Sequence, residues 1–485
     1  MLRELGRTEG DADTLRILVR DQDTRRLLLL RALLDAAEAA SATLCPPRAL
    51  DRLRQDWALL EAAERTDRAA ARTVLFHPFT GPWAQRCLHG LSGPATGPGA
   101  TRAHGSGPAS GAAPPPPSRS APDPRTTARL AADLAHLSRL AAAAAIRAGM
   151  PFTARLTPHD GLLPLPTLGA LRTTSRTVAA DFRDGELSLR QEPGGRALVV
   201  RTRPDGATGS ADPRWLPVFT LPAAQRGIGP VPLDDIDPYR TDVDGPRRHG
   251  LSAAPHIDDR ARESWAAHWA GAVPLLRVGG DHRLTETAVL LRCLVPLAPP
   301  PGSGPTGEGA AHCSGTRREA FGAVLSSEPA TGAYFASTLV HELQHTKLSA
   351  LCALVPLHHE DAAPRHFAPW RPDPRPFDGL LQGAYSHLAL ADYWQRFALG
   401  ARRVTHRDLA WAEHARCREQ VGAVLPVLAG SAALTREGRT LVNEMISLYH
   451  RLDDCPPPTG HLARAKAYVA TTKVIWQQRN GPRRP

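Results

Sequence analysis

The sequence predicts an α+β fold in which helical N- and C-terminal regions surround antiparallel sheet. Three observations predict it: Leu and Ala at helical spacing in the N-terminal part, short alternating segments between residues 151 and 235, and long apolar-periodic segments toward the C-terminus. The chain has 485 residues, of which 42% are hydrophobic. This length exceeds the usual size of one domain and predicts roughly two or three compact units.

Composition divides the first half of the chain into three segments. Residues 1–91 are expected to be helical, because Leu and Ala recur every three or four residues in "TLRILVRDQDTRRLLLLRALLDAAEAA". Residues 92–125 are rich in Pro, Gly, Ser and Ala and are expected to form a disordered insertion. Residues 126–250 begin with a helical pattern and continue with strand-like segments such as "ELSLRQ" and "ALVVRTR", which predict antiparallel sheet.

The second half, residues 251–485, is expected to hold the catalytic region. Strand-like "TAVLLRCLVPLAP" and "EAFGAVLSS" are separated by a Gly/Pro-rich loop at residues 299–317. A helix containing the motif HExxH follows the second strand, and two more helices are expected at residues 378–400 and 407–430.

Charge and cysteine usage restrict the partners and the compartment. The chain has 59 Lys and Arg against 48 Asp and Glu, a net charge of +11, which favours an acidic partner but is equally explained by a general bias toward Arg, Ala, Pro and Gly. Zinc-finger spacing, aromatic-basic RNA motifs and long runs of uncharged apolar residues are absent from the sequence, so neither nucleic acid nor a membrane is the expected partner. Seven cysteines without a CxxC pair indicate a reduced, cytoplasmic protein.

The motif "HELQH" predicts a metal site. His341 and His345 stand at positions i and i+4, so both imidazoles lie on one helix face and can reach one ion. Glu342 is rotated by about 100° from them and can act on a metal-bound water or anchor a neighbouring group. The alternative is a pair of structural histidines on a half-buried helix.

The third ligand determines the class of site. Gly three residues and His six residues after His345 would indicate a metzincin, but Leu348 and Leu351 stand there. His387 is the best candidate, because it lies between apolar faces of a second predicted helix, where an unpaired imidazole would be costly. The other candidates are carboxylates and loop histidines: Glu360, Asp361, Asp392, His358, His359 and His366.

A proline-rich segment, "APWRPDPRPFDGLLQGAY", lies between the motif and His387 and contains Arg371 and Arg375. Prolines stiffen the segment, and a fixed guanidinium near a metal can bind a carboxylate through two hydrogen bonds. Such an arginine could bind the terminal carboxylate of a peptidase substrate. It could equally bind the far carboxylate of a 2-oxo acid that chelates the metal. Alternatively, these arginines pair with Asp373 or Asp378 and make the loop rigid.

Three stretches carry a resemblance to a known family: "LVHELQHTKLSALCALVPL", "APWRPDPRPFDGLLQGAYSHLALADYW" and "HPFTGPWAQRCL". They resemble the HExxH-motif proteins found beside radical-SAM peptide maturases in actinobacterial peptide natural-product clusters. Members are understood as iron(II)- and 2-oxoglutarate-dependent peptide β-hydroxylases whose fold differs from the double-stranded β-helix dioxygenases. The resemblance implies a precursor peptide as substrate and a radical-SAM maturase from the same cluster as a further partner.

The resemblance also implies roles for particular residues. His341, His345 and His387 would hold Fe(II), so three histidines would replace the usual two histidines and one carboxylate. Arg371 and Arg375 would bind the 2-oxoglutarate carboxylate, and Glu342 would be an outer partner of the metal. Two alternatives remain: a zinc peptidase with Glu342 as general base, and a peptide-binding protein without catalysis. The sheet at 151–235 is a candidate for strand addition by the peptide.

Overall fold

The computed structural model describes residues 1–92, 124–203, 205–223, 227–241, 251, 253–300, 312–359 and 362–480. They form two compact units, one of residues 1–25 with 218–485 and the other of residues 26–217. Helices and antiparallel sheets are both present, so the predicted α+β class is confirmed at this level. The residues of the predicted insertion between 93 and 123 lie outside the described part of the chain.

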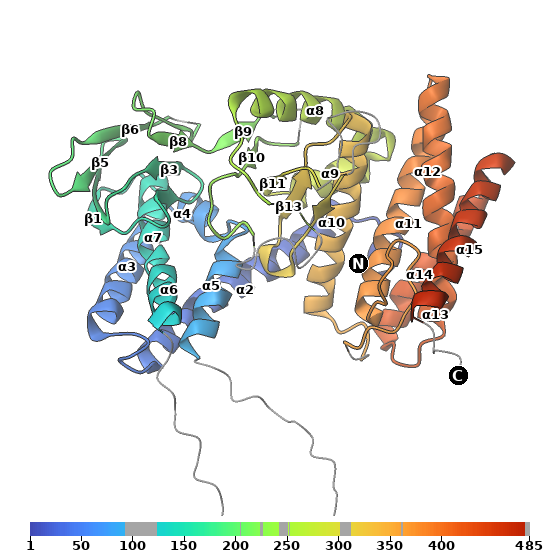
Figure 1. The fold of residues 1–485 in the computed structure, drawn as a ribbon, viewed down its shortest axis with the longest axis horizontal. Helices are drawn as coiled ribbons and strands as arrows, with labels where there is room; N and C mark the ends of the chain where they lie inside the picture. The colour runs from blue at the N-terminus through green and yellow to red at the C-terminus, as the bar shows by residue number, and fades with distance from the viewer. Residues whose placement is uncertain are drawn as a thin grey trace, which may run out of the picture. The chain divides into compact units, whose positions relative to one another are not determined.

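The unit of residues 26–217 packs helices against small antiparallel sheets (Figure 1). Helix α7 is its centre: all but the last residue of "HLSRLAAAAAIR" is buried, and α7 packs on α3, α4, β1 and β2. The alanines let neighbouring elements approach closely. The helices are α2 (Ala12–Ala39, shared with the other unit), α3 (Pro47–Thr66), α4 (Arg68–Leu75), α5 (Thr80–Leu91), α6 (Pro124–Leu134) and α7 (His136–Arg147).

Two antiparallel sheets belong to this unit, with strand orders β1-β4-β5-β6-β7 and β2-β3-β8. Alternation of buried and exposed residues along β4 explains why its pattern is readable from the sequence. The strands are β1 (Phe152–Leu156), β2 (Leu162–Leu165), β3 (Gly169–Arg172), β4 (Thr177–Arg183), β5 (Glu186–Glu192), β6 (Leu198–Thr202), β7 (Thr208–Gly209) and β8 (Trp215–Pro217).

The other unit contains a sheet of mixed direction, with the order β12-β13-β11-β10-β9. β11 is parallel to both β10 and β13, whereas β9 and the edge strand β12 are antiparallel to their neighbours. Every residue of β11 and β13 is buried, as in strands covered on both faces. The strands are β9 (Phe219–Leu221), β10 (Val231–Leu233), β11 (Cys293–Leu297), β12 (Ser314–Gly315) and β13 (Ala323–Ser327).

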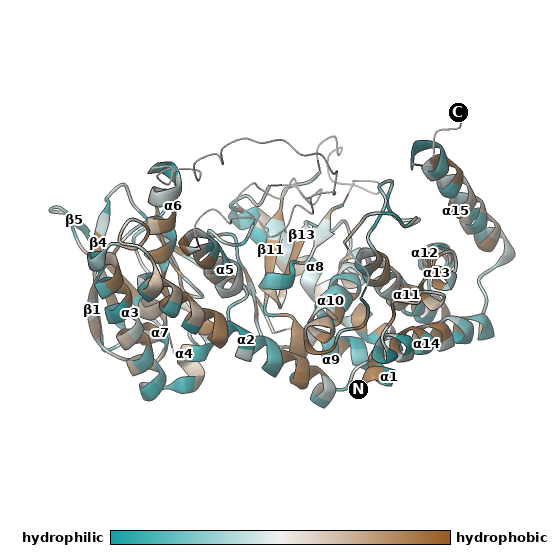
Figure 2. Cartoon of the chain, turned by 90° about the horizontal axis from the view of Figure 1, so that it is seen from below, coloured by the Kyte–Doolittle hydropathy of each residue, from teal (hydrophilic) through white to brown (hydrophobic). Residues whose placement is uncertain are grey.

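Helices of this unit pack around α10 and α11, which contact each other and share one hydrophobic core. Figure 2 shows apolar residues along β11, α10 and α11. The helices are α1 (Leu2–Gly6), α8 (Asp259–Val278), α9 (Asp281–Leu290), α10 (Gly332–Leu354), α11 (Phe377–Gly400), α12 (Val404–Gly422), α13 (Leu425–Ala429), α14 (Arg436–Arg451) and α15 (Thr459–Asn480).

Three local features differ from the sequence-based expectation. The helix expected at residues 407–430 is divided, because α12 ends at Gly422 and Pro426 lies at the start of α13. The first residues of "TAVLLRCLVPLAP" finish α9, and the strand begins only at Cys293. The loop expected at 299–317 contains the short strand β12, which depends on pairing with β13 rather than on its own sequence.

Candidate metal centre

The motif helix α10 begins at a side-chain cap and is anchored by buried residues. The Thr331 hydroxyl accepts the backbone N–H of Tyr334 at 3.3 Å, which satisfies one of the free donors at the helix start. Leu348 and Leu351, which occupy the metzincin positions, are core residues. His341 and His345 stand one turn apart on the same helix, with their Nε2 atoms 3.1 Å apart. The expected one-turn spacing therefore brings both imidazoles to one point.

His387 comes from α11 and is fixed on two sides. Its Nδ1 lies 2.8 Å from the carbonyl oxygen of Gly383, which can only accept, so Nδ1 carries the proton and Nε2 keeps its lone pair. The ring stacks on the indole of Trp370, with centroids 4.5 Å apart and planes 22° apart. The His387 ring lies edge-on to His341, with centroids 5.2 Å apart. α11 thus brings the third imidazole beside the pair from α10.

Hydrogen bonds fix the tautomer of a second ring in this cluster. His345 Nδ1 lies 3.2 Å from Gln382 Oε1 and donates to it, which leaves Nε2 of His345 as an acceptor. Outer partners of this kind commonly fix the tautomer of metal-binding histidines. His341 Nδ1 is buried without a hydrogen-bond partner among the described residues. Nε2 of His345 and Nε2 of His387 therefore keep their lone pairs, and His341 Nε2 lies 3.1 Å from that of His345.

Burial also keeps the three imidazoles neutral, which metal binding requires. Burial, and after it the Arg416 charge, lowers the pKa of His387 to about 3. The pKa of His341 is lowered by burial and then by the neighbouring histidines. Burial likewise lowers the pKa of His345, although its bond to Gln382 opposes this shift.

Glu342 is placed beside the pair rather than between them. Its Oε1 accepts the Ser314 hydroxyl at 2.7 Å and lies 4.0 Å from His341 Nε2. Its Oε2 is buried and has no hydrogen-bond partner in the described part of the chain. Burial raises the pKa of Glu342 to about 7, against the lowering effect of hydrogen bonds from Ser314 and Thr316. The carboxyl group can therefore act as an acid, a base or an anchor.

Arg371 and Arg375 share one carboxylate, as in the alternative considered above. Arg371 Nε donates to Asp373 Oδ1 at 3.1 Å, and Arg375 Nη1 donates to Asp373 Oδ2 at 3.4 Å. Arg375 is the less exposed of the two, and its Nε is buried without a partner among the described residues. One carboxylate between two guanidinium groups leaves a positive charge available to an anionic ligand.

All six predicted site residues line one cavity of about 740 Å³. Among its described lining residues are five arginines and three carboxylates, and Asp378 pairs with Arg318 while Glu319 pairs with Arg317. The five arginines come from the segment around η2 (Arg318–Ala320), the proline-rich loop and α12: Arg317, Arg318, Arg371, Arg375 and Arg416. The cavity therefore favours an anion.

The alternative third ligands take other positions. Asp392 pairs with Arg396 at 3.0 Å and with Arg283 at 3.5 Å, so its charge is used in a buried network. The described residues that line the cavity do not include Asp392 or the loop histidines His358, His359 and His366. Glu360 and Asp361 lie outside the described residues.

Sequence reasoning did not single out several cavity residues. Gly383 is the one that could have been noticed: a Cβ there would lie 2.4 Å from the Trp370 ring, and it stands one turn before His387. Ser314, Gln382 and Arg416 have no local signal, because each reaches the site from a different element through tertiary packing.

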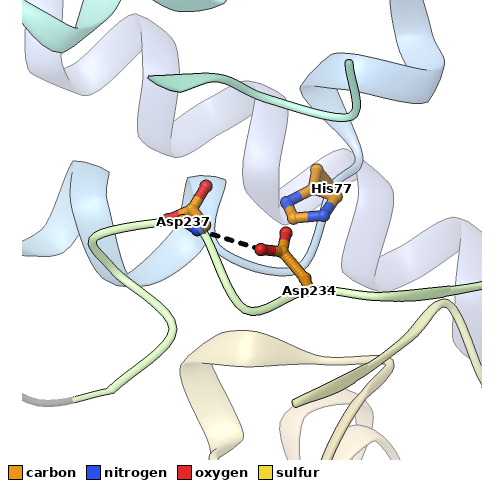
Figure 3. A group of neighbouring side chains, drawn as sticks. All are labelled: His77, Asp234 and Asp237. Carbon is orange, nitrogen blue, oxygen red and sulfur yellow. Dashed lines mark hydrogen bonds between the residues drawn. The ribbon is translucent and has the colours of Figure 1, made fainter. Parts of the chain in front are cut away.

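Two buried aspartates, Asp234 and Asp237, lie in the turn after β10, away from the histidine cluster in sequence. The Asp234 carboxylate accepts the backbone N–H groups of Ile236 at 3.0 Å and Asp237 at 2.9 Å, the latter drawn in Figure 3. Asp237 in turn accepts the N–H of Tyr239 at 2.8 Å. Hydrogen bonds of this kind stabilise a turn. His77, labelled in the same figure, precedes α5 in the other unit, where its ring lies edge-on to Phe79.

Comparison with known proteins gives no family for this chain. Scans of protein-family models and of curated proteins both end without a match. Among the described helices, none is long and apolar enough to cross a membrane.

Proposed function

We propose that the chain is an Fe(II)- and 2-oxoglutarate-dependent hydroxylase that adds a hydroxyl group to the β-carbon of a side chain in a ribosomally made precursor peptide. The substrate peptide, the cytoplasmic location and a radical-SAM maturase as partner belong to this proposal. A fold other than the double-stranded β-helix is part of it as well.

One observation carries the proposal: three neutral imidazoles and a partly uncompensated arginine pair line the same cavity. Three protein nitrogens leave coordination positions for other ligands of Fe(II). If bound there, Fe(II) would supply oxidative chemistry in which O₂ gives one oxygen atom to the substrate C–H bond and the other to 2-oxoglutarate, which becomes succinate and CO₂.

Individual residues would have distinct tasks in this reaction. His341, His345 and His387 would hold the ion, while Gln382 and the Gly383 carbonyl keep two of the rings in the ligating tautomer. Arg375 would bind the distal carboxylate of 2-oxoglutarate, because its Nε is without a partner among the described residues and its side chain is half-buried. Glu342 would act as an outer partner through Ser314.

The test is anaerobic titration of the purified protein with Fe(II) and then with 2-oxoglutarate. We expect a weak visible charge-transfer band that saturates at one equivalent of each, because the 2-oxo acid chelates the iron. His387→Ala should abolish the band, whereas His406→Ala, an exposed histidine on α12, should retain it. Arg375→Met should weaken 2-oxoglutarate binding but leave Fe(II) binding intact. Absence of the band in the wild-type protein would reject the proposal.

Glu342 favours a second candidate, a zinc peptidase. A buried carboxyl with a pKa near 7, 4.0 Å from His341 Nε2, suits a general base acting on zinc-bound water. This candidate predicts tightly bound zinc and peptide cleavage that Glu342→Gln abolishes. The hydroxylase instead predicts an intact peptide heavier by one oxygen atom, formed only with O₂ and 2-oxoglutarate.

A further inference from the structure

Strand β12 (Ser314–Gly315) is the edge of the mixed sheet and borders the cavity of the candidate metal centre. β12 pairs with β13 on one side only, and both of its residues line the cavity. An edge strand has a row of backbone groups that can pair with another chain. Only backbone N–H and C=O groups that point away from β13 are available for such pairing.

The pairing of β12 with β13 determines which backbone groups of β12 face outward. The backbone N–H of Ser327 donates to the carbonyl of Cys313 at 2.8 Å, so these two residues form a hydrogen-bonded pair. Pairs alternate along an antiparallel ladder, which makes the next pair, Ser314 with Ser326, a non-hydrogen-bonded one. The amide and carbonyl of Ser314 therefore point away from β13. Outside the ladder with β13, no backbone group of the described residues bonds to either of them.

The Ser314 side chain connects this edge to the metal centre. Its hydroxyl donates to Glu342, which follows His341 in the motif and lies beside the two histidines. A chain paired with Ser314 would thus pass beside His341 and Glu342, within reach of the candidate reaction centre. The cavity volume of about 740 Å³ accommodates several residues of an extended peptide.

Charge selects the kind of peptide. The described cavity lining has five arginines against three carboxylates. Arg317 and Arg318 pair with Glu319 and Asp378, whereas Arg371 and Arg375 share the single carboxylate of Asp373. Aspartate or glutamate side chains of a peptide paired with β12 would meet the remaining positive charge of this lining. A basic peptide would meet the same charges unfavourably.

We infer that β12 is the docking edge for an extended, acidic peptide segment, which adds a strand to the sheet through the backbone of Ser314. The inference rests on the proposed function in that this peptide would be the substrate. Main-chain hydrogen bonds would supply affinity independent of sequence, and the arginines would supply the preference for acidic residues.

Two variants at one position separate the backbone from the side chain. Ser314→Pro removes the outward N–H and the hydroxyl, while Ser314→Ala removes only the hydroxyl. Proline is compatible with an edge strand when its missing N–H lies on the open side. Thermal melting and far-ultraviolet circular dichroism of both variants establish that they are folded.

The probe is a fluorescein-labelled decapeptide of alternating Asp and Thr, with binding followed by anisotropy in full-length protein. We expect Ser314→Pro to weaken binding by about fivefold or more, as for loss of one net hydrogen bond, and Ser314→Ala to weaken it by less than about twofold. Methylating alternate backbone nitrogens of the peptide should weaken binding similarly in one of the two registers. A Lys-Thr peptide should bind at least about tenfold more weakly than the acidic one.

Each outcome decides for or against strand addition. Equal binding of Ser314→Pro and Ser314→Ala, indifference to N-methylation in both registers, or absence of saturable binding overturns it. Protein that binds the acidic peptide in this backbone-dependent way but binds no Fe(II) removes the proposed hydroxylase and leaves the docking edge intact. If the protein shows the Fe(II) and 2-oxoglutarate band but binds the peptide without dependence on the backbone, the docking edge is rejected and the proposed hydroxylase stands.

Discussion

At the scale of single residues, the orientation of His387 depends on a contact between Trp370 and Gly383. The indole stacks on the imidazole, and it can do so only because residue 383 has no side chain. The Gly383 carbonyl also holds Nδ1 of His387. Trp370 is thus a positioning residue: its indole contacts His387, the third candidate ligand, and fixes the orientation of that ring.

Replacing Trp370 should weaken metal binding through His387. We expect Trp370→Ala to lower Co(II) affinity by about tenfold or more, the usual effect of losing an outer partner, and Trp370→Phe to restore most of it. The measurement is competitive titration with a chelator, followed by the visible Co(II) spectrum. In a His387→Ala background, Trp370→Ala should have little additional effect; an equal loss there would mean that Trp370 only supports the fold.

Glu286 is a buried carboxylate whose ionised form stabilises the protein. Burial raises its pKa, but the Lys347 and Arg283 charges outweigh burial and lower the pKa from 4.5 to about 2. Lys347 contacts Glu286, and Arg283 donates to Glu286 Oε2 at 3.0 Å. Because the folded state holds this proton less tightly than the unfolded chain, the stabilisation is complete above about pH 4.5 and is lost as the pH falls toward 2.

Acid sensitivity should therefore decrease in Glu286→Gln. Between about pH 5 and pH 2, we expect the free energy of unfolding of wild type to fall by up to about 3 kcal/mol more than that of the variant. At neutral pH the variant itself should be less stable by about 3–5 kcal/mol, since Lys347 loses its partner. Urea unfolding across this pH range tests both statements. Glu263→Gln, at an exposed position on α8, should follow wild type.

At the scale of elements, the start of α10 is set by its close approach to α8. A Cβ on Gly332 would lie 2.8 Å from the carbonyl carbon of Gly271, so two glycines meet backbone to backbone. This contact holds the first turn of the motif helix against α8, one of its main packing partners. Small residues at both positions are required for it.

Gly332→Ala should consequently destabilise the protein although alanine favours helix. The clash should cost about 1–3 kcal/mol, more than the gain in helix propensity. Gly460→Ala in α15 is the matched control: nothing lies within 4 Å of a Cβ there, and we expect a change between zero and a gain of about 1 kcal/mol. Chemical unfolding measures both. Equal effects of the two substitutions would contradict the proposed packing role of Gly332.

At the scale of the whole molecule, the first residues of the chain belong to the unit that contains the metal centre. The buried Lys347 on α10 donates to the carbonyl oxygens of Thr8 at 2.9 Å and Glu9 at 3.1 Å. The Tyr385 hydroxyl on α11 donates to the Leu5 carbonyl at 2.5 Å. The N-terminal segment thereby satisfies polar groups on the buried sides of both ligand-bearing helices.

Deletion of residues 1–10 should leave those groups without partners and loosen the metal centre. Hydrogen exchange should show lost protection in α10 and α11, while α3, α7 and β4 of the other unit keep theirs, because unsatisfied buried donors are costly. Deletion should also reduce Co(II) binding. Unchanged exchange in α10 would contradict the anchoring role of this segment.

Features that depend on local periodicity can be predicted from the sequence alone. The α+β class, the helix with His341 and His345, and the strands β4 and β5 follow from spacing over a few residues, which sets the face that each side chain occupies. The place of His387 in an apolar helix predicts it as the third ligand, and the structure brings its ring beside that of His341.

The surroundings of that cluster depend on tertiary packing and have no local sequence pattern. The Trp370 stack, the Ser314 bond to Glu342 and the edge position of β12 join segments that are distant in sequence, and β12 is too short for its residues to specify a strand. The grouping of residues 1–25 with 218–485, which differs from the segments predicted by composition, likewise arises from packing. Such contacts depend on the simultaneous burial of many side chains, which no local pattern encodes.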